Sequence, residues 1–213
     1  MTLQQQLDAF KAQFINNAPE EAKTIMNRAT QDLFESGILE NTPKVGDILP
    51  GFSLKNQDGE TIQSDDLLQK GPLVISFFRG VWCPYCNIEL KSLQSYADQF
   101  RTAGANIVVI SPQEQPSAQK TITENGLSFD VLSDIGNSYA QQLGLTFTLP
   151  ADLQTVYQGF NINLPDHNGD DSWMLPMPAR LVIDASGKVL FTDINPDYTQ
   201  RTDPAETLAV LTP

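Results

Sequence analysis

The chain has 213 residues and a formal net charge of −13, from 26 acidic and 13 basic side chains. Nucleic acids and anionic membrane surfaces are bound through Lys and Arg, so we expect neither as a partner of so acidic a chain. Apolar residues make up 40% of the sequence, which is ordinary for a globular protein, but no apolar run approaches the roughly 20 residues that a membrane-spanning helix needs.

Residues 1–42 are predicted to form an N-terminal extension of two helices. Apolar side chains of the first helix repeat at the spacing of one helical face: Leu3, Leu7, Phe10 and Phe14. In the second helix, Pro19 stands in the first turn and Gly37 at the end, positions where these residue types are favoured. We expect this hairpin to cover part of the core or an edge strand; the alternative is a dimer contact.

The first residues lack the basic and apolar regions of a secretory signal, and they contain too little Arg for a transit peptide. The expected location is therefore cytoplasmic. In that reducing compartment the two cysteines, Cys83 and Cys86, are more often catalytic or metal-binding than part of a structural disulfide framework.

Residues 43–213 are predicted to form one α/β domain. The apolar runs at 72–78 and 105–111 are typical of buried parallel strands. Helices are expected at 84–102, where apolar residues follow a helical period, and before Gly126. Strands that alternate with helices imply βαβ units, right-handed crossovers and a mostly parallel central sheet.

Two hairpins and one irregular segment complete the predicted domain. Turn-forming residues at 58–59 and at 186–187 lie between strand-forming runs, which is the pattern of a hairpin. Residues 146–177 are expected to be a loop-rich insertion. They contain the single histidine, His167, which is interpreted as a surface residue, with a proton relay as the alternative.

The motif C-P-Y-C, residues 83–86, follows a predicted strand and begins a predicted helix. A thiolate there meets unpaired N–H groups and the positive end of the helix dipole, which lower the pKa from its usual value of about 8.5. Cys86 lies nearest the helix body, so its pKa is expected to fall. Pro84 is tolerated in a first turn, and two cysteines at this spacing can close a disulfide.

Other interpretations of the motif are weaker. A structural zinc site needs four ligands, usually Cys and His, and the chain offers two cysteines and one histidine, so no metal is expected. A buried, inert pair remains an alternative, although the position at a helix start argues against it. Trp82 is expected to pack beside the site, and Tyr85, between the cysteines, to be exposed there.

The segment "KVGDILPGFSLKNQDGETIQSDDLLQKGPLVISFFRGVWCPYC" resembles the start of the alkyl hydroperoxide reductase/thiol-specific antioxidant (AhpC/TSA) family, the peroxiredoxins. The likeness rests on Gly46, Pro50, Phe52, Leu54 and the D-G hairpin, and "VWCPYC" looks like the active-site turn of the thioredoxin fold. It extends over residues 44–193. It implies a peroxiredoxin-like thioredoxin fold with a central mixed sheet flanked by helices, and no cofactor.

Laid on the family pattern P-x-x-x-T-x-x-C, the peroxidatic cysteine falls on Cys86, while Cys83 replaces the threonine and Arg79 the proline. Further on, "MPARLVIDASGKV" resembles the thioredoxin-fold segment that starts with a cis-proline, for which Pro178 is the candidate. Arg180 then corresponds to the arginine that reaches the peroxidatic thiolate in the family.

The resemblance implies a thioredoxin-dependent peroxidase. The Cys86 thiolate would attack H₂O₂ or an alkyl hydroperoxide and become a sulfenic acid, with Arg180 stabilising the charge and Arg79 adding positive potential. Cys83 would then close a disulfide that a thioredoxin- or glutaredoxin-type partner reduces. Two alternatives remain: a thiol–disulfide oxidoreductase in which Cys83, preceded by Trp82, is the nucleophile, and a redox sensor without turnover. A homodimer is also implied.

Overall fold

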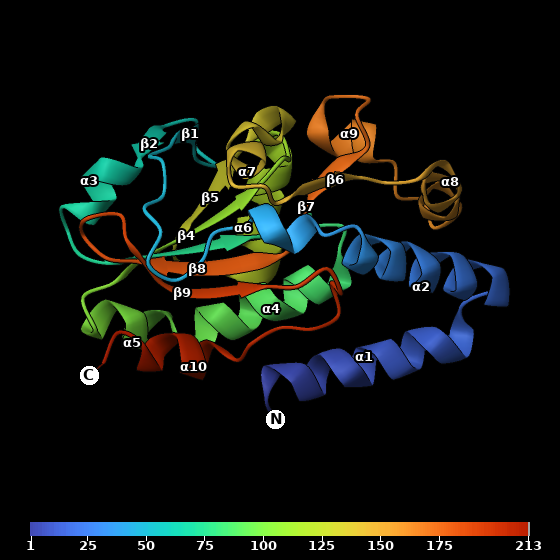
Figure 1. Ribbon diagram of the computed structural model, residues 1–213, viewed down its shortest axis with the longest axis horizontal. Coiled ribbons are helices and arrows are strands. Elements are labelled where there is room, and N and C mark those ends of the chain that lie inside the picture. Colours follow the sequence, from blue (N-terminus) through green and yellow to red (C-terminus); the bar gives the residue numbers. More distant parts are fainter. Residues whose placement is uncertain (213) are drawn as a thin grey trace.

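Seven strands form the central sheet of the computed structural model, which describes residues 1–212 (Figure 1). Their order across the sheet is β2-β1-β5-β4-β3-β8-β9, and β6 pairs with β7 in a second small sheet. The strands are β1 (Ser53–Lys55), β2 (Thr61–Gln63), β3 (Leu73–Phe77), β4 (Asn106–Ser111), β5 (Asp130–Ser133), β6 (Thr146–Thr148), β7 (Met174–Pro176), β8 (Ala179–Ile183) and β9 (Val189–Ile194).

The strand β3 lies inside the sheet and leads into the C-P-Y-C motif. It pairs in parallel with β4 on one side and antiparallel with β8 on the other. All five of its residues are buried, as the continuous apolar run predicted. Parallel pairing is confined to β5-β4-β3, because β8 and β9 form a hairpin at one edge and β1 and β2 at the other. The expected mixed sheet is confirmed, but the expectation that it is mostly parallel is wrong: within residues 1–212, only two of its six strand pairings, β3-β4 and β4-β5, are parallel.

Helices cover both faces of this sheet (Figure 1). They are α1 (Leu3–Asn17), α2 (Glu20–Glu35), α3 (Ser64–Leu68), α4 (Pro84–Ser95), α5 (Ala97–Thr102), α6 (Gln115–Asn125), α7 (Ser138–Gln142), α8 (Ala151–Gly159), α9 (Leu164–Asn168) and α10 (Pro204–Ala209), with 3₁₀ turns at Ile38–Asn41 and Ile135–Asn137. Successive residues of β3 point to opposite faces, so Leu73, Ile75 and Phe77 join the core under α7, and Val74 joins the core under α4, α5 and α6.

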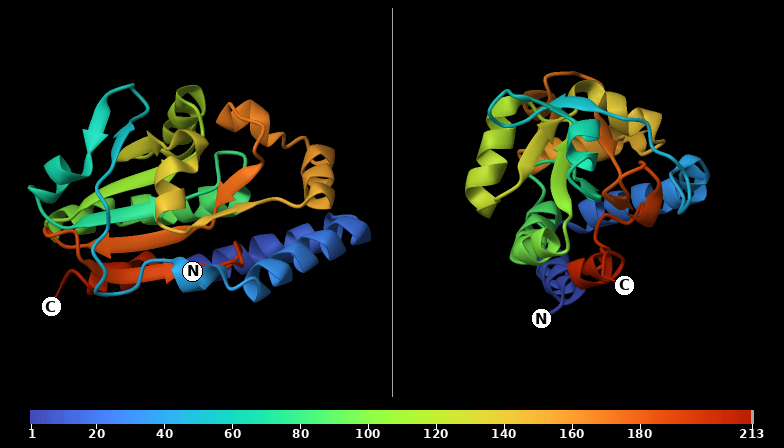
Figure 2. Two further views of the ribbon diagram at one scale, coloured as in Figure 1. Left: turned by 45° about the horizontal axis from the view of Figure 1, so that its top comes forward. Right: turned by 90° about the vertical axis from the view of Figure 1, so that its left-hand side faces the viewer.

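The N-terminal extension is helical, as predicted, and its two helices make different contacts. Thr2 and Gln5 cap α1 reciprocally, each side chain bonding the other's backbone N–H. Leu3 and Leu7 are buried where α1 packs on α4. The helix α2 packs against α8, and Figure 2 shows α1 and α2 running side by side away from the sheet. The domain boundary near residue 42 stays a prediction.

Two expectations about secondary structure are wrong in detail. The helix expected at 84–102 is broken at Tyr96 (φ −103°, ψ −1°) into α4 and α5. The segment 146–177 is more regular than its sequence indicated: β6 and β7 pair antiparallel, and α8 and α9 lie between them. The pairing joins residues at opposite ends of that segment, so no local pattern reveals it.

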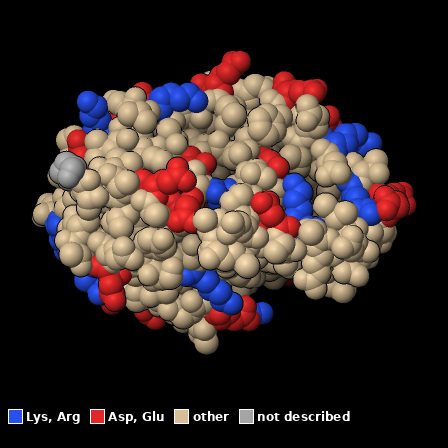
Figure 3. All heavy atoms as spheres, turned by 90° about the horizontal axis from the view of Figure 1, so that it is seen from below, with Lys and Arg blue, Asp and Glu red and all other residues tan. Residues whose placement is uncertain are grey.

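The outer surface carries charges of both signs. On the face shown in Figure 3, acidic and basic side chains are interspersed, with wide uncharged areas between them. Within residues 1–212, no helix combines the length and the apolar character that crossing a bilayer requires.

Candidate active site

The two cysteines lie together at the point where β3 passes into α4. Cys83 is the N-cap residue of α4 and Cys86 belongs to its first turn. Both thiols are free, and neither residue has exposed surface. The Cys86 thiol donates a hydrogen bond to the Cys83 sulfur over 3.0 Å. A disulfide has an S–S bond of about 2.05 Å, so a small approach of the two side chains is enough to close one.

Two residues at the junction of β3 and α4 suit their backbone positions. Pro84 occupies the first helical position, where a missing N–H costs nothing, as predicted. Gly80 has a φ of +152°, and a Cβ there would collide with the indole of Trp82. Trp82 packs beside the site as expected, 5.7 Å from the ring of Tyr157.

Arg79 contacts the sulfurs of both cysteines, whereas the sequence indicated only a nearby positive charge. Its Nη2 donates to the Cys83 sulfur at 3.6 Å, and its backbone N–H donates to the Cys86 sulfur at 3.5 Å. The guanidinium lies 4.1 Å from the ring centroid of Tyr198, and the rings of Trp82 and Tyr157 lie 5.2 and 5.8 Å away. These aromatic faces attract a buried cation and hold it beside the sulfurs.

The two thiols differ in acidity, and the order is opposite to the one expected. Burial opposes ionisation of Cys83, but the hydrogen bond from Cys86 and the charge of Arg79 outweigh it and lower the pKa of Cys83 to about 5. Burial and the neighbouring Cys83 raise the pKa of Cys86 well above its ordinary value. The expectation of an acidic Cys86 is wrong because Cys83, as the N-cap residue, receives the hydrogen bonds.

Arg180 is held by a carboxylate that the sequence analysis did not single out. Its Nη2 lies 2.6 Å from Glu89 Oε1, and Arg201 Nε lies 2.7 Å from Glu89 Oε2, all three side chains being buried. Arg180 also donates to the Thr202 carbonyl and the Thr207 hydroxyl. Among residues 1–212, its hydrogen bonds reach these oxygens and no sulfur. The contact between Arg180 and a thiolate therefore stays a prediction.

Arg180 and Arg201 together bind the Glu89 carboxylate, a cluster named here the Glu89 clamp, and its charges affect the ionisation of the thiols. Burial would raise the pKa of Glu89, but the charges of Arg201 and Arg180 lower it, so this carboxylate stays ionised. The Arg201 charge also favours ionisation of both cysteines. Glu89 and Cys86 both lie in the first turns of α4, and their helical spacing is the sequence signal by which Glu89 could have been found. No sequence feature near Arg201 indicated the site.

Two further expectations about the site are wrong. Tyr85 is buried, not exposed, since α1 brings Phe10 to 5.1 Å from its ring and Tyr198 lies 5.4 Å away on another side. Burial raises the pKa of Tyr85 to about 12. No peptide bond in residues 1–212 is cis, so Pro178, between β7 and β8, is in the trans form that X–Pro bonds prefer.

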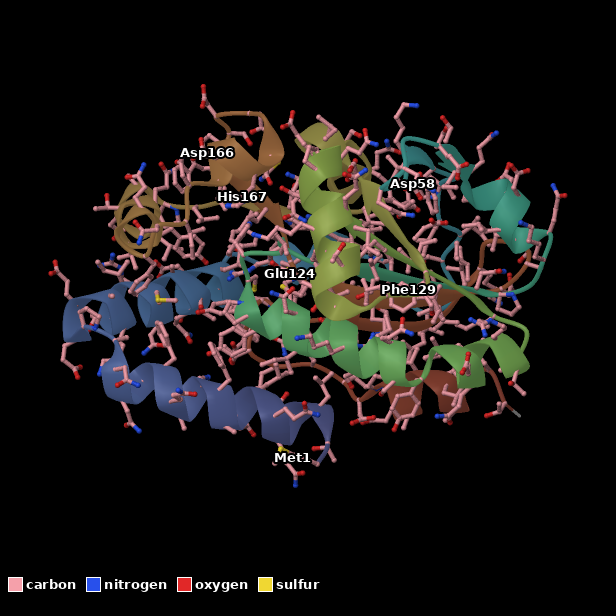
Figure 4. The ribbon with its side chains drawn as sticks, turned by 180° about the vertical axis from the view of Figure 1, so that it is seen from behind. Met1, Asp58, Glu124, Phe129, Asp166 and His167 are labelled. Carbon is pink, nitrogen blue, oxygen red and sulfur yellow. The ribbon has the colours of Figure 1, made fainter. Side chains whose placement is uncertain are left out.

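His167 lies on α9, on the side of the molecule that also holds α2 and α8 (Figure 4). Its ring centroid is 6.5 Å from that of Trp82, and its carbonyl accepts a hydrogen bond from the Glu114 N–H. Partial burial lowers the pKa of this histidine. The imidazole is therefore near the site without contacting a sulfur through any described hydrogen bond.

Comparison with known proteins identifies the family of the chain. The AhpC/TSA family profile matches residues 45–192, so the chain belongs to the AhpC/TSA family. The helices α1 and α2 lie outside the matched segment.

Individual relatives and solved structures agree with this family assignment. The chain is 26% identical over 152 residues to peroxiredoxin Q, chloroplastic, of Triticum aestivum, a match covering 71% of this chain and 68% of that protein. It is 30% identical over 105 residues to peroxiredoxin Bcp of Escherichia coli strain K12, covering 49% and 67%. The crystal structure of peroxidoxin BcpB from Mycobacterium tuberculosis has a TM-score of 0.61 at 24% identity, covering 79% of this chain and 96% of that one.

These likenesses confirm the family resemblance and the peroxiredoxin-like thioredoxin fold. The named relatives support a thiol-peroxidase activity, the class of function that the family resemblance implied.

Proposed function

We propose that the protein reduces hydrogen peroxide and organic hydroperoxides through the Cys83–Cys86 pair, as a thioredoxin-dependent peroxidase. One observation carries this proposal: two free thiols lie 3.0 Å apart at the start of a helix, with the Arg79 guanidinium 3.6 Å from one of them. The pair has the proximity that disulfide formation needs, and it has a fixed positive charge for the reacting oxygen.

The first step is a proton transfer within the pair. In the resting state Cys83 is the thiolate and Cys86 the thiol, joined by the S–H···S hydrogen bond. Moving that proton to Cys83 makes Cys86 the nucleophile, in agreement with its position in the family pattern. Cys83 thereby acts as the general base for Cys86, a role that its place on the hydrogen bond supports.

The oxidation then follows in two balanced steps. The Cys86 thiolate attacks the terminal peroxide oxygen, so that an S–O bond forms, the O–O bond breaks, and the departing alkoxide or hydroxide takes up a proton from solvent water. The Cys83 thiol next condenses with the Cys86 sulfenic acid, forming the disulfide and releasing water. Arg79 stabilises charge on the oxygens, and Arg180 is assigned a supporting role through the Glu89 clamp.

The disulfide is returned to two thiols by exchange with a reduced dithiol protein of the thioredoxin or glutaredoxin type. Because neither cysteine has exposed surface, this exchange requires side chains around the motif to move.

A cytoplasmic location and a homodimer remain parts of the proposal. The compartment differs among relatives, since the wheat protein is named chloroplastic.

A second function has one observation in its favour. The lowered pKa of Cys83, about 5, is what a thiol–disulfide oxidoreductase of the thioredoxin type requires of its first cysteine. In that case Cys83 attacks protein disulfides directly, and Cys86 resolves the mixed disulfide.

Rapid mixing of the reduced protein with hydrogen peroxide separates the two functions. Thiol loss is followed in the wild type, in Cys83→Ser and in Cys86→Ser, and the sulfenic acid is trapped with dimedone and located by peptide mass spectrometry. We expect fast oxidation in the wild type, no fast phase in Cys86→Ser, and trapped Cys86 in Cys83→Ser. The Ser hydroxyl cannot replace a thiolate as base, so Cys83→Ser should also react more slowly than the wild type.

Either of two results would contradict the proposal. Fast oxidation of Cys86→Ser with the adduct on Cys83 would exchange the roles of the cysteines. Oxidation of all three proteins at the rate of an ordinary exposed thiol, together with rapid reduction of a protein disulfide, would establish the oxidoreductase.

A further inference from the structure

A cavity of about 280 Å³ lies between α2, β6, α8 and the chain after β9. Its walls are largely apolar, with Met26 and Leu33 from α2, Phe147 from β6 and Leu153 from α8. Two charged side chains line it. Asp32 is exposed and stands at the rim, whereas Arg79 is buried.

Arg79 connects this cavity to the thiols. One face of its guanidinium meets Tyr198, which also lines the cavity, and its Nη2 reaches the Cys83 sulfur at 3.6 Å. The buried Nε of Arg79 has no hydrogen-bond partner, and within residues 1–212 no carboxylate forms an ion pair with this arginine. The other two buried arginines, Arg180 and Arg201, are both paired with the Glu89 carboxylate, whereas the charged neighbour of Arg79 is the Cys83 sulfur.

We propose that this cavity binds the apolar organic group of an alkyl or aryl hydroperoxide and presents its peroxide group to Arg79, with α2 as the element that sets substrate preference. The inference rests on the peroxidase function proposed above. It also goes beyond that function, because α2 lies outside the segment that matches the family, residues 45–192.

Size and polarity both suit such a group. An apolar cavity of about 150 Å³ is enough to hold benzene, so 280 Å³ has room for an aryl-alkyl group. Transfer of that group from water to the apolar wall contributes binding energy that hydrogen peroxide cannot obtain. The sulfur is oxidised and the peroxide is reduced to an alcohol, while the Arg79 charge faces the oxygen that leaves with the organic group.

The test compares two peroxides in variants of α2. Ala29 lines the cavity, and Ala29→Trp would fill it. Thr24, which is exposed on the same helix and away from the cavity, provides the matched control Thr24→Trp. We expect the ratio of kcat/KM for cumene hydroperoxide to kcat/KM for hydrogen peroxide to fall at least about tenfold in Ala29→Trp, and Thr24→Trp to keep the wild-type ratio.

A second variant and a binding measurement guard against a folding defect. Leu33→Ala removes an apolar contact at a half-buried position, and it should raise the KM for cumene hydroperoxide relative to that for hydrogen peroxide. Calorimetry with 2-phenyl-2-propanol, the unreactive product alcohol, should show binding to the wild type and to Thr24→Trp, and weaker binding to Ala29→Trp.

The outcomes separate this inference from the proposed function. An unchanged ratio in both Ala29→Trp and Leu33→Ala, or equal alcohol binding by wild type and Ala29→Trp, would overturn the cavity assignment. If the wild type turns over neither peroxide, yet binds the alcohol in a manner that Ala29→Trp abolishes, the ligand site stands and the peroxidase function fails.

Discussion

At the residue scale, the chemistry of this site depends on one hydrogen bond between sulfurs. The Cys86 thiol and the backbone of α4 both stabilise negative charge on Cys83, and Arg79 adds a third contact. The acidity thus belongs to the pair, since the same bond that favours the Cys83 thiolate keeps Cys86 protonated. A serine or an alanine at position 86 distinguishes these contributions, because serine keeps a donor and alanine does not.

We predict that the ultraviolet thiolate absorbance of the reduced wild type rises with a midpoint near pH 5, which is the pKa of Cys83. In Cys86→Ala the midpoint should move upward, because the thiolate loses its donor, while Cys86→Ser should stay closer to the wild type. A midpoint that is equal in the alanine and serine variants would show that the Cys86 hydrogen bond does not set the acidity.

The lowered pKa of Cys83 also makes the stability of the folded protein depend on pH. Cys83 ionises near pH 5 in the folded state and near 8.5 in an unfolded chain, so the folded protein binds fewer protons between these values. Its contribution to the free energy of unfolding is fully present above about pH 8.5 and is lost as the pH falls towards 5. Cys86, whose pKa is raised, works in the opposite sense in alkaline solution.

At the element scale, the N-terminal helices are part of the site's surroundings. The helix α1 buries Leu3 and Leu7 on α4, the helix that carries the cysteines, and it sets Phe10 against Tyr85. The helix α2 instead supplies one wall of the cavity beside Arg79. Neither contact follows from the amphipathic patterns of the two helices, which show only that each has a face to bury.

We predict that Leu7→Ala lowers the free energy of unfolding by about 2–5 kcal/mol, the range for a fully buried leucine. The same variant should increase the rate at which the reduced cysteines react with a bulky aromatic disulfide reagent, because Tyr85 is covered through α1. Gln6→Ala, at an exposed position of the same helix, is the control for both measurements. Unchanged thiol reactivity in a destabilised Leu7→Ala would show that α1 does not restrict access.

At the scale of the whole molecule, the cysteines are part of the core, among the side chains that join β3 to α4. The short distance between their sulfurs means that oxidation requires little rearrangement of the backbone. This differs from a site in which two distant cysteines must be brought together. The opening needed for the reductant is then a separate, transient event.

We therefore predict that the oxidised and reduced proteins have the same radius of gyration by small-angle scattering and the same far-ultraviolet circular dichroism. The double variant Cys83→Ser/Cys86→Ser, with and without peroxide, controls for oxidation elsewhere. A larger radius in the oxidised wild type alone would mean that the disulfide displaces α1 or α4. The oligomeric state follows from the same scattering curves, since a homodimer doubles the scattering mass.

Local sequence patterns predicted several elements of the fold correctly. The apolar run before the C-P-Y-C motif predicted β3, and the turn residues at 58–59 and 186–187 predicted two hairpins that the structure contains. These features depend on local patterns. The break at Tyr96 and the β6–β7 pair were missed, because the first depends on packing and the second on residues far apart in the chain.

The sequence by itself determined the family, the fold and the pair of cysteines, because these depend on motifs, periodicity and the order of strands and helices. Only the tertiary structure decided which thiol is the acidic one, that Glu89 binds both Arg180 and Arg201, and that Arg79 lies between the thiols and a cavity. The physical reason is range: hydrogen bonds, ion pairs and burial act over a few ångströms, between side chains that the chain brings together only when it folds.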